Sequence, residues 1–228
     1  MEVGKAIIIQ RLIDTSRCDR LAAKREESAM PETLLSRVPV EQLPEDFQRL
    51  RESSIAVAGD GDRLEVFGHH PALYRWYQSN FYGAVFENGS PDMRVDRRWK
   101  ELIRLKLSLT NGCFVCNAHN VPAAAAAGYS QAQIDAMDDE DSPLFTPQEQ
   151  AVLALGRLFA IADPDPSLTP DLYARLSAHF SDAEILELGF VATILSGWTK
   201  LVFAYGLITR ECPIGSPERT ATPSETHL

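Results

Sequence analysis

The sequence has few basic residues, few cysteines and no obvious membrane segment, and each shortage excludes a class of protein. It has 22 Lys and Arg against 32 Asp and Glu, which gives a net charge of −10. A surface of that sign repels phosphate groups and anionic lipid, so we expect no nucleic-acid partner and no membrane partner. We expect no apolar run of the ~20 residues that cross a bilayer, and the run at residues 6–9 is too brief for a signal peptide. The sequence therefore predicts a soluble, cytoplasmic protein.

Length and composition predict one globular domain with two appended segments. The chain has 228 residues, 45% of them hydrophobic, which is enough for a packed core. Residues 1–29 mix charges with a short apolar run and predict an N-terminal appendage, and Met30 is an alternative translation start to Met1. Residues 30–212 form the expected single domain. Residues 213–228 are rich in Pro, Ser, Thr and Glu, and predict a flexible C-terminal tail.

Helix-start signals recur through the second half of the chain. Thr146, Ser130 and Ser181 are each followed three residues later by Glu or Gln, as in a capping box. Thr169 precedes a proline, which suits the first position of a helix. Gly128 ends an alanine-rich run and is typical of a helix stop. With apolar residues at helical spacing after these starts and no clear hairpin, the sequence predicts an all-α fold.

One segment imitates a strand. Residues 105–109, Leu-Lys-Leu-Ser-Leu, alternate between apolar and polar residues. However, Leu102, Leu105 and Leu109 also share one helical face, and the run 97–110 is long for a strand. We therefore predict a helix over residues 97–110.

The motif that carries chemistry is Cys113-x-x-Cys116. Four cysteines are too few for the disulfide framework of a secreted scaffold, so the pair indicates redox chemistry or a metal. Gly112 breaks the preceding helix, which places Cys113 near the first turn of the next one, where free N–H groups stabilise a thiolate. Cys116 returns to the same face one turn later. We expect the two Cα atoms to lie within the window of about 4.4–6.8 Å that a disulfide requires.

Two further residues complete this candidate site. His119 follows Cys116 by three residues, and its imidazole can take the proton of a neighbouring thiol. Glu101 lies on the preceding helix, from which its carboxylate can orient the imidazole if the two helices pack antiparallel. A zinc site needs a fourth ligand and a less continuous spacing, so we expect no metal and no cofactor. The plainest alternative is that the cysteines are two small buried apolar residues.

The spacing Glu101-x11-Cys113-x2-Cys116 with a nearby histidine resembles the AhpD/carboxymuconolactone decarboxylase family, and the likeness covers roughly residues 65–208. It implies an AhpD-like helical bundle, a homo-oligomer (trimer or hexamer) and an antioxidant enzyme, a thiol peroxidase and disulfide reductase. It also implies that Cys116 attacks a small hydroperoxide, that Cys113 resolves the product and that a dithiol or protein reductant reopens the disulfide. His119 and Glu101 would form the proton relay.

The histidine departs from the family pattern by one position. The family histidine lies four residues after the second cysteine, where this chain has Asn120. Both positions neighbour Cys116 on a helix, so either His119 or Asn120 completes the relay.

An alternative activity is that of a lyase or isomerase acting on a small carboxylated or lactone substrate, with Glu101 and His119 as acid and base. A noncatalytic redox sensor is a third reading. Apolar neighbours of the cysteine pair favour an organic hydroperoxide as substrate. They are Phe114, Val115, Trp99 and Trp198.

Overall fold

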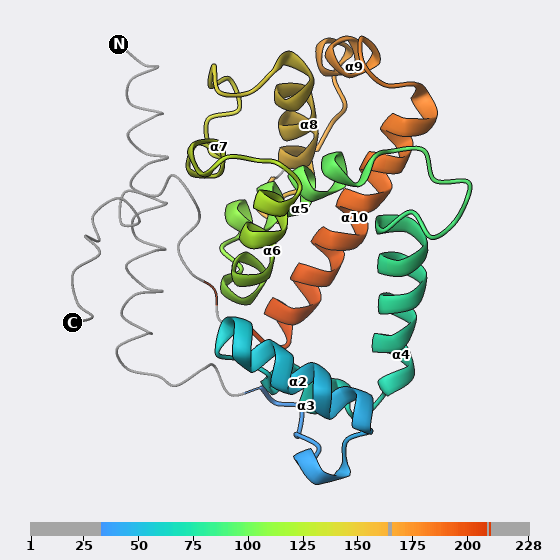
Figure 1. The fold of residues 1–228 in the computed structure, drawn as a ribbon, viewed down its shortest axis with the longest axis vertical. Coiled ribbons are helices and arrows are strands. Elements are labelled where there is room, and N and C mark those ends of the chain that lie inside the picture. The colour runs from blue at the N-terminus through green and yellow to red at the C-terminus, as the bar shows by residue number, and fades with distance from the viewer. Residues whose placement is uncertain (1–32, 164–165, 209, 211–228) are drawn as a thin grey trace, which may run out of the picture.

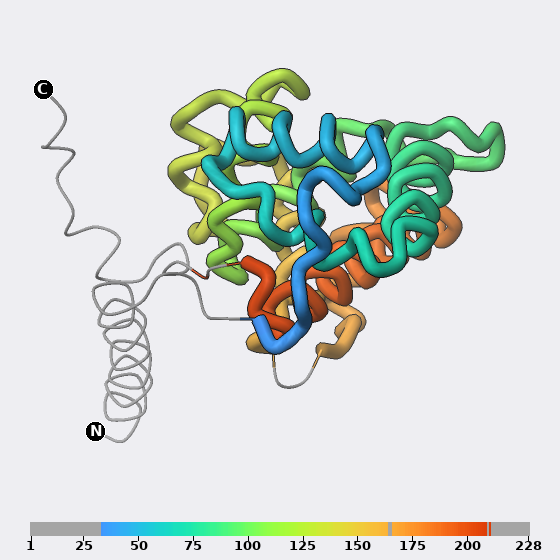
Figure 2. Tube along the Cα trace, turned by 90° about the horizontal axis from the view of Figure 1, so that it is seen from below, coloured from blue at the N-terminus to red at the C-terminus, as the bar shows by residue number. Residues whose placement is uncertain are grey.

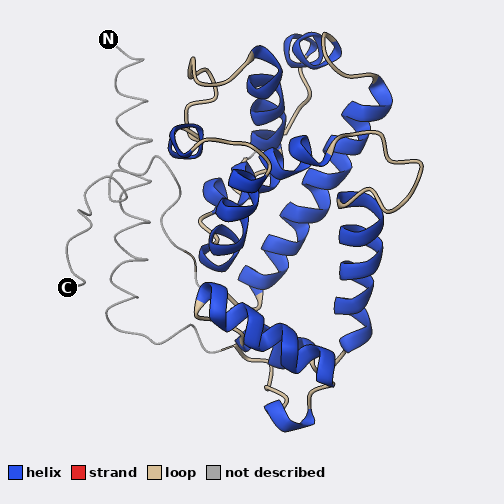
Figure 3. Cartoon of the chain, in the orientation of Figure 1, coloured by secondary structure: helices blue, strands red, loops and turns tan. Residues whose placement is uncertain are grey.

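The computed structural model describes residues 33–163, 166–208 and 210. Within these ranges the chain forms helices and no strand, only an isolated bridge between Cys113 and Arg210 (Figure 3). The elements in chain order are η1 (Val40–Gln42), α2 (Glu45–Ala58), α3 (Asp62–Phe67), α4 (Pro71–Trp76), η2 (Tyr77–Phe86), α5 (Arg97–Asn111), α6 (Phe114–Ala126), α7 (Gln131–Asp135), α8 (Pro147–Leu158), α9 (Pro170–Ser177) and α10 (Asp182–Ala204). The all-α fold class is confirmed. The predicted appendage 1–29 and tail 213–228 lie outside the described residues.

The predicted helix starts are all present. Capping boxes at Ser130, Thr146 and Ser181 open α7, α8 and α10, each with both reciprocal hydrogen bonds. Thr169 caps α9 with its hydroxyl. Gly128 follows the end of α6 with a φ of 98°, a conformation in which a Cβ atom would be strained. These helix starts can be predicted from the sequence because a capping box joins residues only three positions apart.

Helix α5 lies at the centre of the bundle and contacts α6, α8 and α10 (Figure 1). It is buried on nearly every side, including its lysines. Lys100 is fully buried and pairs with Glu187 of α10 at 2.6 Å, while Lys106 pairs with Glu140 at 3.0 Å. Lys106 therefore sits in the interior beside a carboxylate, which is why the segment 105–109 alternates without being a strand. The helix predicted over residues 97–110 is confirmed as α5.

The expectation that no apolar run is long enough to cross a bilayer is wrong for α10. This helix has 23 residues and is, by length and composition alone, long and apolar enough to cross a membrane. Between Glu187 and Ala204, Lys200 is the one charged residue. In the fold α10 runs through the bundle and buries Leu188 and Val191 against its neighbours, as the core helix of a bundle does.

The elements before α5 close one end of this bundle. Figure 1 shows α2 and α3 beside the C-terminal end of α10, and Figure 2 shows the same end of the bundle from below. Trp198 of α10 stacks on Tyr77 at 3.8 Å and on Phe67 at 5.0 Å between ring centroids, with Tyr74 edge-on at 5.8 Å. Stacked and edge-on rings of this kind add to the burial of apolar surface. They join α3, α4 and η2 to α10 beside the start of α6.

Candidate active site around the cysteine pair

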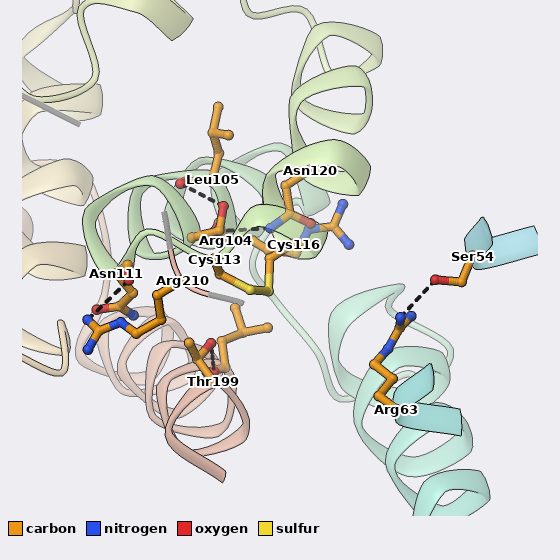
Figure 4. The surroundings of a disulfide bond; sticks show 12 residues. Ser54, Arg63, Arg104, Leu105, Asn111, Cys113, Cys116, Asn120, Thr199 and Arg210 are labelled. Atoms are coloured by element: carbon orange, nitrogen blue, oxygen red, sulfur yellow. Dashed lines mark hydrogen bonds between the residues drawn. A yellow bond between two sulfur atoms is a disulfide. The ribbon is translucent and has the colours of Figure 1, made fainter. Parts of the chain in front are cut away.

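The cysteine pair lies where α5 turns into α6. Gly112 ends α5 in the left-handed conformation, with a φ of 65°, and Cys113 is the extended N-cap residue of α6. Cys113 and Cys116 are joined by a disulfide, with 5.2 Å between their Cα atoms (Figure 4). The predicted bridging distance is confirmed. The turn fixes one cysteine before the helix and the other one turn into it, so both sulfurs reach the same side.

The two cysteines differ in exposure. Cys113 is completely buried, in an apolar cluster that includes Val202 and Leu207. Cys116 is partly exposed and lines a cavity of about 350 Å³. A reagent that enters the cavity therefore meets the sulfur of Cys116 first, and Cys113 can react only with its neighbour.

This cysteine cavity is shared by seven elements, α2, α3, α4, η2, α5, α6 and α10. Its lining includes Ser54, Arg63, Tyr74, Tyr77, Gln78, Tyr82, Arg104, Cys116, His119, Asn120 and Trp198. Tyr77, Gln78 and Tyr82 come from η2, a ten-residue π-helix. π-Helical segments are rare and occur frequently at functional sites. Burial raises the pKa of Tyr74 and raises that of Tyr77 well above its usual value, so both phenols stay protonated at neutral pH.

His119 and Asn120 both reach the cavity, so the structure brings both relay candidates to Cys116. The Nε2 atom of His119 is buried and has no hydrogen-bond partner among the described residues. Burial, and then the charges of Arg63 and Arg104, lower the pKa of His119 below its usual 6.5. The imidazole is therefore neutral at pH 7 and able to accept a proton. Asn120 is buried and donates from Nδ2 to the Arg104 carbonyl at 3.5 Å.

Glu101 does not line the cavity. Its side chain is 1% exposed and forms ion pairs with Arg97 at 3.1 Å and Arg104 at 2.5 Å. No hydrogen bond joins it to His119 within the part of the chain that the structure describes. Glu101 instead lies behind Arg104, which itself faces the cavity. The spacing Arg97-x3-Glu101-x2-Arg104 on one helix is a signal from which this pairing could have been predicted.

Two arginines that line the cavity were not predicted from the sequence. Arg104 lies over the rings of Phe86 and Tyr82, with 4.9 Å and 5.9 Å from its guanidinium carbon to the ring centroids. Arg63 comes from α3 and donates to Ser54 Oγ at 2.7 Å (Figure 4). No local motif marks Arg63, because it is 50 residues or more from the cysteines in sequence and reaches them only through the packing of α3.

The apolar neighbours expected around the cysteines divide into two groups. Val115 and Trp198 line the cavity. Phe114 is 40% exposed and Trp99 packs edge-on against Phe180 at 5.6 Å, so neither belongs to the lining. The spacing on α6 accounts for Phe114, since the residue directly after the N-cap points away from the face that carries Cys116.

Sequence comparison finds a likeness to a known family over the part of the chain that holds this site. The model of the carboxymuconolactone decarboxylase family matches residues 71–157, a range that contains Glu101, both cysteines of the pair and His119. The uncharacterised protein YdfG of Bacillus subtilis (strain 168) is 23% identical over 113 residues, which are 49% of this chain and 76% of that protein.

Solved structures share the fold. A candidate AhpD antioxidant defence protein of unknown function from Agrobacterium tumefaciens is 22% identical, with a TM-score of 0.53 over 72% of this chain and 99% of that one. An uncharacterised peroxidase-related protein with an AhpD core from Ralstonia eutropha JMP134 is 16% identical, with a TM-score of 0.57 over 80% and 94%. The debrominase Bmp8, solved with 2,3,4-tribromopyrrole, is 16% identical, with a TM-score of 0.58 over 84% and 97%. The chain thus shares the fold of AhpD-like proteins, and its cysteine site lies within the stretch that matches the carboxymuconolactone decarboxylase family.

Proposed function

We propose that the chain is a thiol peroxidase of the AhpD-like type that reduces small organic hydroperoxides with Cys116 and Cys113. The observation that carries the proposal is the bridged pair itself, with one sulfur open to a cavity and the other completely buried. A peroxidase with an attacking and a resolving thiol needs this asymmetry, because only the attacking thiol must reach the peroxide. Cys116 is then the attacking thiol and Cys113 the resolving one.

The cycle has three balanced steps. The Cys116 thiolate attacks the distal oxygen of the hydroperoxide, the O–O bond breaks, and the departing alkoxide takes a proton to leave as the alcohol. Cys116 is then a sulfenic acid, which condenses with the Cys113 thiol to form the disulfide and release water. A dithiol or a protein reductant finally reduces the disulfide by two electrons and two protons and leaves as its own disulfide.

The cavity favours a thiolate at Cys116. Arg63 and Arg104 both line it, and nearby positive charge lowers the pKa of a thiol. His119 is neutral at pH 7 and can take the thiol proton, which it can return to the alkoxide. Glu101 then affects Cys116 indirectly, because its ion pair holds Arg104 in place.

The setting of this activity is part of the same proposal. A disulfide that must be reopened in every cycle suits a reducing compartment, so we place the protein in the cytoplasm. We also propose a homo-oligomer, as is typical of AhpD-like proteins. Leu186 and Phe190 on the outer face of α10 are 75% and 51% exposed, which suits a contact between subunits.

The alternative activity of a lyase or isomerase has less support. It requires Glu101 and His119 to act together on a bound substrate, whereas Glu101 is 1% exposed, is paired with two arginines and does not line the cavity. It also leaves the asymmetric cysteine pair without a role.

Peroxide turnover tests the proposal. The intact chain should consume cumene hydroperoxide when supplied with dithiothreitol or dihydrolipoamide, and Cys116→Ser should abolish the reaction. Cys113→Ser should still consume one equivalent of peroxide and leave a sulfenic acid on Cys116, detected by mass spectrometry after trapping with dimedone. Equal activity of the intact chain and Cys116→Ser would refute the proposal. Parallel assays with 2,3,4-tribromopyrrole would show whether the chain shares the debrominase reaction of its structural neighbour.

A further inference from the structure

The cysteine cavity is positively charged although the protein as a whole is acidic. The chain carries a net charge of −10. Its acidic and basic side chains are nevertheless unevenly distributed around this cavity. Among the residues that line the cavity there are two arginines and one histidine, and no aspartate or glutamate. Its tyrosines Tyr74 and Tyr77 remain protonated, so they do not balance the arginines. An acidic protein that collects cations around one cavity presents an attractive site for an anion.

The two arginines differ in how their charge is neutralised. Arg104 is paired with the buried Glu101 at 2.5 Å. Arg63 donates to neutral oxygens, Ser54 Oγ at 2.7 Å and the Asp60 carbonyl at 3.4 Å, and is also hydrogen-bonded to Tyr74. Burial raises the pKa of the nearby Asp60 carboxyl group, and the charge of Arg63 opposes that rise. No carboxylate forms an ion pair with Arg63 in the described ranges of the chain. Of the two arginines in the cavity, Arg63 is therefore the one that no carboxylate contacts directly.

Other polar atoms of the lining also lack partners. Arg104 Nε and His119 Nε2 are buried and unbonded within the described part of the chain. Buried polar groups in folded proteins are almost always hydrogen-bonded, so unpaired ones at a cavity wall point to a polar ligand group. The rest of the lining combines polar side chains, such as Gln78 and Thr199, with apolar and aromatic ones, among them Leu107, Val115, Leu195 and Trp198. A ligand that combines an anionic group with an apolar body fits the arginines and the apolar part of this lining.

We infer that the cavity selects substrates that carry a carboxylate, and that Arg63 is the residue that binds it. The inference deepens the proposed function, because the bound molecule would lie in the cavity into which Cys116 opens. The substrate class is then a small organic hydroperoxide with a carboxylate on an apolar or aromatic body. Arg63 lies outside the family-matched residues 71–157, so this preference comes from the α2–α3 segment that closes the bundle.

The chemistry of the two partners accounts for the preference. The guanidinium of an arginine presents a planar fork of N–H donors that matches the two oxygens of a carboxylate. Trp198 and Tyr77 are already stacked with their planes 3° apart, so the wall that they form suits a flat ring. A volume of about 350 Å³ is at the lower end of the usual range for ligand sites, which fits a molecule of the size of a substituted benzene.

Binding of a paired set of probes tests the inference without any turnover. Benzoate and the neutral benzamide have nearly the same shape, and isothermal titration calorimetry on the full-length disulfide form measures both. Benzoate should bind about tenfold to a hundredfold more tightly than benzamide, as expected for a charge-assisted hydrogen bond. Arg63→Gln should reduce that ratio to about one. Arg49→Gln is the matched control, since Arg49 lies on α2 with its side chain 69% exposed and does not line the cavity.

A second measurement needs no variant and guards against misfolding of Arg63→Gln. Phenylglyoxal modifies arginines, and benzoate should slow its reaction at Arg63 while benzamide does not, as followed by peptide mass spectrometry of the unmutated chain. Equal binding of benzoate and benzamide, binding of neither, an unchanged ratio in a folded Arg63→Gln or no protection of Arg63 would each overturn the inference.

Turnover then separates this inference from the peroxidase proposal. Cumene hydroperoxide and its para-carboxylate differ only in the charged group, and the ratio of their kcat/KM values cancels any effect of Arg63 on the thiolate. The ratio should favour the carboxylate in the intact chain and fall about tenfold or more in Arg63→Gln. A benzoate preference without peroxide reduction would refute the peroxidase proposal alone. Peroxide reduction without a carboxylate preference would refute only the role of Arg63.

Discussion

Replacing His119 with glutamine tests whether this imidazole activates Cys116. Burial and the charges of Arg63 and Arg104 hold the pKa of His119 below 6.5, so the ring is neutral and ready to accept a proton at pH 7. The rate at which the reduced chain reacts with peroxide should therefore rise with pH below 6.5 and level off near neutrality. Glutamine keeps a similar size and polarity but has no group that titrates in this range.

The size of the loss follows from the thiolate population. A cysteine with an unperturbed pKa of ~8.5 is only about 3% thiolate at pH 7, which corresponds to a loss of about 30-fold relative to a fully ionised thiol. Arg63 and Arg104 remain in the variant and offset part of this loss, whereas loss of proton transfer to the leaving alkoxide adds to it. We expect a decrease of about tenfold to a hundredfold at pH 7 that shrinks as the pH approaches 9.

Stopped-flow peroxide kinetics and the rate of iodoacetamide alkylation against pH measure this directly, since alkylation reports the pKa of the thiol. His179→Gln is the control, because His179 is exposed at the end of α9 and does not line the cavity. If His119→Gln is silent and Asn120→Ala reduces the rate, the relay runs through Asn120 and our assignment is wrong. If both are silent and Glu101→Gln is not, the carboxylate acts without either residue.

Three further predictions concern stability and assembly. Glu101→Gln leaves the largely buried Arg104 without its carboxylate and should lower the free energy of unfolding by about 3 kcal/mol in a denaturant titration, whereas a change below about 1 kcal/mol would show that the pair contributes little. The pKa of His119 is lowered in the folded state, so the unfolded chain binds more protons below ~6.5 and the free energy of unfolding should fall as the pH drops through that value. His119→Gln should lose part of this pH dependence. Parallel curves of unfolding free energy against pH for the two proteins, from about pH 7.5 to 5.5, would contradict the assignment. Leu186→Glu places a charge on the exposed face of α10 and should dissociate the proposed homo-oligomer in light scattering, and an unchanged mass would contradict a subunit contact on this face.

The parts of this fold that could be predicted from the sequence are those that depend on near neighbours. The caps at Ser130, Thr146 and Ser181 are bonds between residues three apart, and the structure confirms each one. The approach of Cys113 and Cys116 follows in the same way from one turn of helix. Helical spacing fixes such distances whatever the rest of the chain does.

The rest of the site depends on packing between distant elements. Arg63, Tyr74 and Trp198 meet only because α3, α4 and α10 converge beside α6, and no spacing in the sequence encodes that convergence. Glu101 was expected to reach His119 across two antiparallel helices. It pairs instead with Arg97 and Arg104, which lie one turn away on its own helix. Helical spacing alone predicts these two ion pairs, whereas a contact between Glu101 and His119 would depend on how two helices pack.

The burial of α5 on nearly every side determines where the molecule opens when it fluctuates. Its residues form the centre of the main core, and Lys100 ties it to α10. Amide hydrogens in such a helix exchange with solvent only when the whole domain unfolds, whereas short peripheral helices such as α3 open locally at a smaller free energy. Hydrogen exchange should therefore be slowest in α5 and stay so after the disulfide is reduced. Helix α3, which carries Arg63, can then open locally to admit a ligand while α5, which positions the cysteines, stays folded.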